Sequence, residues 1–139
     1  MDEIKKELEK EYVKLNAMKN QLNELVVQKK ILESKMNEVS ETIETIDGVK
    51  NMKRGADMWA SIGSGVFVLT SMKTPDKVIV DVGAGALIEK NIEEAKEFLN
   101  KKMDELKALY QQLSQNILQY TEEAKKSEDR ILELSNKKL

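Results

Sequence analysis

The sequence has no cysteine and no histidine among its 139 residues. Without cysteine, neither a disulfide framework nor a thiolate metal site can form. Without histidine, the chain lacks the commonest general base and the commonest metal ligand. Ser61, Ser64 and Ser71 therefore have no imidazole to activate them as nucleophiles. These absences predict a protein that is not an enzyme, with no catalytic, metal or cofactor site.

Aromatic residues are also scarce, at 4%, whereas charged residues make up 35% of the chain. That balance is typical of long solvated helices rather than of a thick globular core. The net charge of −2 gives no reason to expect nucleic-acid binding. The longest uncharged run, from Met58 to Met72, is shorter than the about 20 apolar residues that cross a bilayer, so no membrane contact is predicted. The first residues, MDEIKKELEKEY, lack the apolar stretch of a signal peptide, and a cytoplasmic location is expected.

Glycine and proline are confined to the middle of the chain. All six glycines and the single proline lie between Gly48 and Gly85. Because these residues punctuate turns and weaken helices, they divide the chain into segments. We expect a coiled-coil helix at 1–47 that ends at a left-handed cap on Gly48, a linker at 48–56, two β-hairpins at 57–87 and a second coiled-coil helix at 88–139.

Both outer segments carry an apolar seam with alternating steps of three and four residues, which is the heptad pattern of a coiled coil. The second seam has one stutter, a repeated step of four from Leu99 to Met103, which locally unwinds the supercoil. The first seam runs through Met1, Ile4, Leu8, Glu11, Leu15, Met18, Leu22, Leu25, Lys29, Leu32, Met36, Val39, Ile43 and Ile46. The second runs through Ile88, Ile92, Ala95, Leu99, Met103, Leu106, Tyr110, Leu113, Ile117, Tyr120, Ala124, Ser127, Ile131 and Leu134. The two seams are similar in length, which predicts a long antiparallel pair, about 70 Å from end to end at 1.5 Å per residue.

The centre reads as β structure. Segments 57–62 and 66–72 flank Gly63-Ser64-Gly65, and segments 77–82 and 86–90 flank Gly83-Ala84-Gly85, so each set predicts a hairpin. The second glycine turn also resembles the start of a dinucleotide-binding unit. That reading needs a small residue where Ile88 stands and a parallel strand after the helix, and the sequence has neither. The predicted fold class is therefore α+β.

The predicted strands are apolar on both faces, and such strands expect cover on both faces. The helices use their apolar seams on each other, so we expect several chains to bury their hairpins together in a β-barrel body. The alternative is a small monomeric domain folded against the base of the helices. The predicted oligomer interface comprises Trp59, Val66, Phe67, Val68, Leu69, Val78, Ile79, Val80 and Val82.

The second hairpin carries a recognisable segment, DKVIVDVGAG at 76–85, followed by Ile88-Glu89-Lys90. Together with the order helix, two hairpins and helix, this segment resembles the α class of prefoldin subunits over nearly the whole chain. The resemblance implies a hexamer of two α and four β subunits with a double β-barrel body and six coiled-coil arms. It also implies an ATP-independent holdase whose tips capture non-native proteins and pass them to a group II chaperonin. A single-subunit branch related to the α class forms filaments instead. Segment 48–56 does not match the family signature.

The tip of the predicted helix pair, where the two chain ends meet, is the expected site of contact with non-native proteins. The candidates are Ile4, Leu8, Tyr12, Val13, Ile131, Leu132, Leu134 and Leu139. Alternatively, these residues only close the coil. Off-seam Val26, Val27 and Ile31 form a second apolar cluster halfway along the arm.

Two other functions compete with the chaperone reading. One is a filament or scaffold subunit with the arms as spacers, and the other is a tethering coiled coil that binds one folded partner. Partners expected for the chaperone are β-class prefoldin subunits or copies of the chain, unfolded client proteins and a group II chaperonin.

Overall fold

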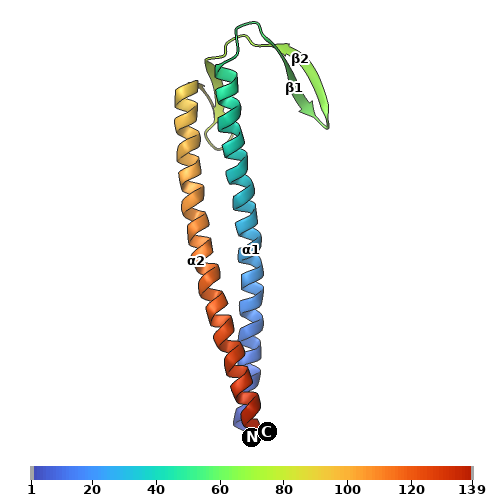
Figure 1. Cartoon of the computed structure of the whole chain (residues 1–139), viewed down its shortest axis with the longest axis vertical. Coiled ribbons are helices and arrows are strands. Elements are labelled where there is room, and N and C mark those ends of the chain that lie inside the picture. Colours follow the sequence, from blue (N-terminus) through green and yellow to red (C-terminus); the bar gives the residue numbers. More distant parts are fainter. Residues whose placement is uncertain (1, 139) are drawn as a thin grey trace. The chain divides into compact units, whose positions relative to one another are not determined.

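The computed structural model describes residues 2–138, with only the backbone of Lys138. In chain order, two antiparallel hairpins lie between two long helices, which are drawn as coiled ribbons in Figure 1. The elements are α1 (Asp2–Lys50), β1 (Asp57–Gly63), β2 (Val66–Ser71), β3 (Lys77–Asp81), β4 (Leu87–Asn91) and α2 (Ile92–Lys138). This order confirms the predicted α+β class.

The chain divides into two compact units. The terminal unit combines α1 up to Lys35 with α2 from Leu106 onward, and the central unit is Met36–Glu105. Each helix therefore contributes one part to each unit.

In the terminal unit, the two helices run antiparallel. Arg130 Nη2 lies 3.4 Å from Glu7 Oε2, and Tyr110 donates a hydrogen bond of 3.1 Å to Glu33. The early residues of α1 thus lie beside the late residues of α2, and both ends of the described chain are at the tip (Figure 1). The buried cluster between the helices consists of Leu8, Leu15, Met18, Ala124, Ile131 and Leu134, with Ile4, Leu22 and Tyr120 packed against it.

The predicted seams are confirmed within the described residues. Every seam position of α1 from Ile4 to Ile46 is buried or half-buried, and so is every seam position of α2 from Ile92 to Leu134. Burying a leucine such as Leu134 stabilises a fold by about 1.5–3 kcal/mol. The helices therefore owe their stability to this stripe rather than to the intrinsic helix preference of the many charged residues.

In the central unit, α1 continues past its predicted end. Gly48 lies inside the helix and is not among the glycines with positive φ, so the predicted left-handed cap there is wrong. The helix extends because Val49 packs against a cluster of Ile46, Ile92 and Ala95. The amide of Met52 then bonds the carbonyl of Val49 at 3.0 Å and closes the last turn.

Helix α2 begins at Ile92, so the predicted start near Ile88 is wrong. Ile88 lies in β4 opposite Val80. The side chain of Asn91 caps the helix, because its Oδ1 accepts a hydrogen bond of 2.8 Å from the amide of Glu94. An Asn followed three residues later by Glu is a capping signature, and it marks this boundary in the sequence.

The two hairpins share one turn geometry. Ser64 and Gly65 have φ of 51° and 77°, and Ala84 and Gly85 have φ of 51° and 75°. These left-handed φ values match the twist of antiparallel strands. Glycine, which has no Cβ, adopts them without steric strain and stands at the second position of each turn. β1 pairs with β2 from Asp57↔Ser71 to Gly63↔Val66, and β3 pairs with β4 from Lys77↔Asn91 to Asp81↔Leu87.

Candidate functional site

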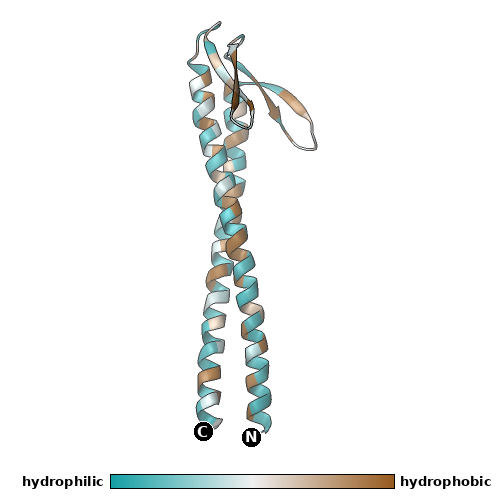
Figure 2. Ribbon diagram, turned by 90° about the vertical axis from the view of Figure 1, so that its right-hand side faces the viewer, coloured by the Kyte–Doolittle hydropathy of each residue, from teal (hydrophilic) through white to brown (hydrophobic). Residues whose placement is uncertain are grey.

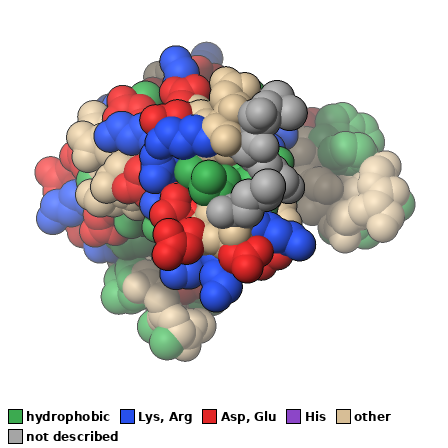
Figure 3. Space-filling view, turned by 90° about the horizontal axis from the view of Figure 1, so that it is seen from below, with side chains coloured by type: hydrophobic (Ala, Val, Ile, Leu, Met, Phe, Trp, Pro, Cys, Tyr) green, Lys and Arg blue, Asp and Glu red, His purple; other side chains and the backbone are tan. Residues whose placement is uncertain are grey.

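Three of the predicted tip residues are exposed on the terminal unit. Tyr12 is 56% exposed, Val13 71% and Leu132 62%. All three lie outside the seam, so the coiled coil leaves them in solvent. Seen from the end of the helix pair, charged side chains border a small apolar area (Figure 3).

The other predicted tip residues are placed differently. Leu8, Ile131 and Leu134 are buried between the helices, and Ile4 is half-buried against the same cluster. Leu139 lies outside the described residues. The structure therefore brings four of the candidates together in the closed seam and leaves three on the outer surface.

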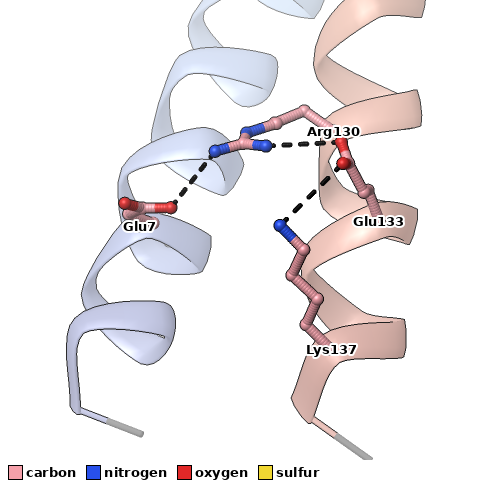
Figure 4. Close-up of polar contacts among 4 residues, drawn as sticks. All are labelled: Glu7, Arg130, Glu133 and Lys137. Carbon is pink, nitrogen blue, oxygen red and sulfur yellow. Dashed lines mark hydrogen bonds and ion pairs between the residues drawn. The ribbon is translucent and has the colours of Figure 1, made fainter.

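A chain of ion pairs joins the helices at the tip (Figure 4). Arg130 lies between Glu7 on α1 at 3.4 Å and Glu133 on its own helix at 3.3 Å, and Lys137 lies 4.0 Å from Glu133. All four side chains are substantially exposed, so each pair contributes at most about 1 kcal/mol. Of these contacts, the Arg130–Glu7 pair crosses between the helices, and the apolar residues outside the seam remain exposed.

One polar layer interrupts the apolar seam. Ser127 is buried and donates a hydrogen bond of 2.7 Å to Glu11 Oε2 on the other helix. A satisfied polar pair in a seam favours one register of the two helices. Glu11 and Ser127, the polar residues of the two seams at this level, are thus partners.

A shallow groove of about 430 Å³ lies on α1 near the tip, lined by Lys6, Glu9, Lys10, Val13 and Lys14. The three lysines recur every four residues on one helix face. Like charges at this spacing destabilise a helix by about 0.2–0.5 kcal/mol per pair. Val13 therefore projects from a face on which positive charge outweighs negative charge.

Further along the terminal unit, more apolar side chains lie outside the seam. Val26, Val27 and Ile31 are exposed, as the sequence pattern indicated. Leu109 and Leu118 on α2 are also exposed, and the sequence interpretation missed them. Their positions outside the heptad seam are the sequence signal that could have predicted this exposure.

In the central unit, the β1–β2 hairpin exposes apolar side chains on both faces. The exposed residues are Trp59, Ile62, Val66, Phe67, Val68 and Leu69, of which only Ile62 was not predicted as interface. Since neighbouring residues along a strand point to opposite faces, the consecutive run from Val66 to Leu69 leaves neither face covered. The hydropathy colouring shows apolar stretches in the hairpins (Figure 2).

The β3–β4 hairpin is covered on one face only. Val78 and Val80 pack against the cluster of Ile46, Ile92 and Ala95. Ile79 and Val82 are exposed, and so are Leu87 and Ile88, which the predicted interface omitted. The predicted interface residues of this hairpin thus divide between the chain's own core and its surface.

Two ion pairs join the end of α1 to the start of α2. Lys50 Nζ donates a hydrogen bond of 2.7 Å to Glu93, which lowers the pKa of Glu93 below its usual value. Lys96 pairs with Asp47, and this hydrogen bond raises the pKa of Lys96. All four side chains are at least partly exposed, so these pairs add only modestly to the stability of the contact between the end of α1 and the start of α2.

The second glycine turn belongs to an antiparallel hairpin, as predicted, because β3 and β4 pair directly. Gly83 donates its amide hydrogen to Asp81 Oδ1 at 2.9 Å, so the local carboxylate occupies the amide that a phosphate would need. Within residues 2–138, no helix is long and apolar enough to cross a bilayer.

Comparison with known proteins identifies the family. The prefoldin family profile, described as prefoldin subunit, matches residues 18–137. Prefoldin subunit alpha of Thermofilum pendens is 28% identical over 109 residues, which cover 78% of this chain and 82% of that protein. A filamentous PFD from Methanocaldococcus jannaschii, solved by cryo-EM, has a TM-score of 0.74 at 24% identity and covers 85% of this chain and 95% of its own.

The crystal structure of the prefoldin beta subunit from Thermococcus strain KS-1 is also similar, with a TM-score of 0.58 at 14% identity over 90% of this chain and 89% of that one. At such identities the structural likeness shows a shared fold. The family profile, in contrast, spans most of the sequence and includes the second-hairpin segment. The chain therefore belongs to the prefoldin subunit family.

Proposed function

We propose that this chain is a subunit of an ATP-independent cytoplasmic chaperone. Its tip captures non-native proteins, and the assembled particle passes them to a group II chaperonin. The family consists of chaperones rather than enzymes, which supports this class of function. The observation that carries the proposal is the exposure of Tyr12, Val13 and Leu132 beside a closed apolar seam.

Non-native proteins differ from folded ones in exposing apolar segments. The three exposed tip residues offer such segments a small apolar contact bordered by charges that keep the free protein soluble. Because helix ends fray, Ile4, Leu8, Ile131 and Leu134 become available as the last turns open. Leu139 would extend this surface.

The hairpins supply the second half of the proposal, which is assembly. The β1–β2 hairpin exposes apolar side chains on both faces, and a neighbouring subunit of the β class or another copy of this chain would cover them. A particle with several arms raises the local concentration of weak sites, and avidity exceeds single-site affinity by roughly 10²–10⁴. Release then follows from competition by the chaperonin rather than from nucleotide hydrolysis.

Removing the tip tests the client site. Deleting residues 1–12 and 130–139 together is expected to leave assembly intact, because the hairpins are retained, but to abolish protection of an unfolded protein from aggregation. Light scattering measures protection and native mass spectrometry measures assembly. A matched variant, Val27→Ser with Leu109→Ser, removes two exposed apolar residues away from the tip and should still protect. Full protection by the tip deletion would refute the client site.

A filament or scaffold subunit is the second candidate function. It is favoured by the likeness to a filamentous PFD and by a β1–β2 hairpin whose two faces are both open to copies of the chain. Native mass spectrometry and electron microscopy of the purified chain, with and without a β-class subunit, separate the two. Growth of filaments by the chain alone supports the scaffold, whereas a discrete particle formed only with the β-class subunit supports the heteromeric chaperone.

A further inference from the structure

The groove on α1 near the tip combines apolar and cationic surface in a way that the proposed client site alone does not require. Among its lining residues, Glu9 and Lys10 follow Lys6 by three and four positions, and Val13 and Lys14 follow Lys10 by three and four, so all five share one helix face. Val13 is the most exposed of the large apolar residues at the tip, at 71%. The aliphatic stems of lysine side chains cover apolar surface while their ammonium groups remain in water.

The lysines of this groove differ from Arg130 and Lys137, the paired cations at the tip. Within the part of the chain that the structure describes, Lys6, Lys10 and Lys14 lie in no ion pair, whereas Arg130 and Lys137 do. Glu9 supplies the groove's single negative charge. The groove therefore presents an apolar floor with a cationic rim that is free to meet an incoming anion.

The exposed apolar residue of α2 at the tip, Leu132, has different surroundings. Leu132 follows Glu128 and Asp129 by four and three residues, which places these acidic residues on its side of the helix. An uncharged apolar segment would suit either surface. Glu128 is itself paired with Lys19 at 3.7 Å, whereas Asp129 has no ion-pair partner within the described residues, so a segment with its own acidic residues suits the α1 groove better.

From this arrangement we infer that the α1 groove selects client segments in which aliphatic side chains stand next to Asp or Glu. The inference rests on the proposed client-binding function and names its substrate class. The apolar residue contacts Val13 and the lysine stems, and the carboxylates meet the ammonium groups of Lys6, Lys10 and Lys14. Because these charges are exposed, added salt screens their attraction and weakens the preference; the screening length is about 8–10 Å near physiological salt.

Three fluorescent peptides of identical aliphatic content, flanked by Glu, Gln or Lys, test the inference with the full-length chain. Fluorescence anisotropy at low salt should show the Glu-flanked peptide binding about 10-fold more tightly than the Gln-flanked one, and the Lys-flanked one most weakly. The difference should largely disappear in 1 M salt. The variant Lys6→Gln/Lys10→Gln/Lys14→Gln should bind the three peptides alike. The matched variant Lys30→Gln/Lys35→Gln/Lys107→Gln has the same net charge and should keep the preference.

The outcomes separate this inference from the proposed function. Equal binding of all three peptides by the unmodified chain overturns the inference and leaves the client site in place, whereas no binding of any peptide counts against the client site itself. A preference that persists in the groove variant also overturns the inference. Sedimentation velocity is the final check: if the groove variant loses self-association and the peptides do not compete with it, the groove binds a second copy of the chain and the inference is wrong.

Discussion

The two hairpins of the central unit have almost the same local structure and opposite environments. Each turns through a glycine, a small residue in the left-handed region and a second glycine. In each, the first glycine donates its amide hydrogen to the side chain two residues earlier: Gly63 to Ser61 Oγ at 3.3 Å and Gly83 to Asp81 Oδ1 at 2.9 Å. Yet β3 packs Val78 and Val80 on the helices, while β1–β2 leaves apolar side chains exposed on both faces.

The difference comes from how each hairpin is attached. β4 runs directly into α2, and the amide of Ile92 bonds the carbonyl of Asp76 at 3.2 Å, so the β3–β4 hairpin is held at the base of the helix. The β1–β2 hairpin is connected through irregular segments at 51–56 and 72–76. Turn chemistry therefore makes a hairpin, and attachment decides whether its apolar face joins the chain's own core or stays available to another chain.

A matched pair of valine substitutions should give the largest contrast between the hairpins. Val80→Asp places a carboxylate against Ile46, Ile92 and Ala95 and should lower the free energy of unfolding of the isolated chain by about 3 kcal/mol. Val68→Asp puts the same group on a strand in solvent and should change that free energy by less than about 0.5 kcal/mol. Thermal unfolding at low micromolar concentration measures both.

In assembly, by contrast, Val68→Asp should have the large effect. Native mass spectrometry with a β-class subunit is expected to show that Val68→Asp no longer assembles, although it is folded by circular dichroism. Lys73→Gln, an exposed change between the hairpins, serves as the control for both measurements. Equal destabilisation of the isolated chain by the two valine variants would mean that the β1–β2 hairpin has a partner within its own chain.

The sequence predicted well what depends on local pattern. Heptad steps identified the seam residues, with Glu11 and Ser127 among them, although not that these two pair, and the glycine turns identified both hairpins. It did less well where tertiary contact overrides local preference. Gly48 is helical because Val49 has a place to pack, and Val80 is covered while Val68 is not, which no strand pattern distinguishes.

Replacing the last glycine of each hairpin turn with alanine tests the same difference between the hairpins through a smaller effect. Gly65 and Gly85 have φ of 77° and 75° with open space around them, so alanine costs only backbone strain, about 1–2 kcal/mol at either site. In Gly85→Ala this cost should lower global stability, because the β3–β4 hairpin is part of the packed base. In Gly65→Ala it should appear only as faster amide exchange in β1 and β2. Hydrogen exchange with mass spectrometry distinguishes these results, and slower exchange in either hairpin would contradict the strain argument.

The smallest expected effect is a pH dependence at the junction that holds the β3–β4 hairpin. Lys50 lowers the pKa of Glu93 below 4.5, so this pair stabilises the fold above that pH and loses its effect as the pH falls through the lowered value. Asp47 raises the pKa of Lys96 above 10.5, so that pair stabilises below pH 10.5 and is lost as the pH rises through the raised value. Between about pH 5 and 10, the contribution of these pairs to the melting temperature should therefore not change with pH. Lys50→Gln should act mainly on the acidic limb of the profile and Asp47→Asn mainly on the alkaline limb, with a smaller effect on the other limb because the four charges are close together. Amide exchange in β1 and β2 should be unchanged throughout. An acid-sensitive β1–β2 hairpin would show that it, too, depends on this junction.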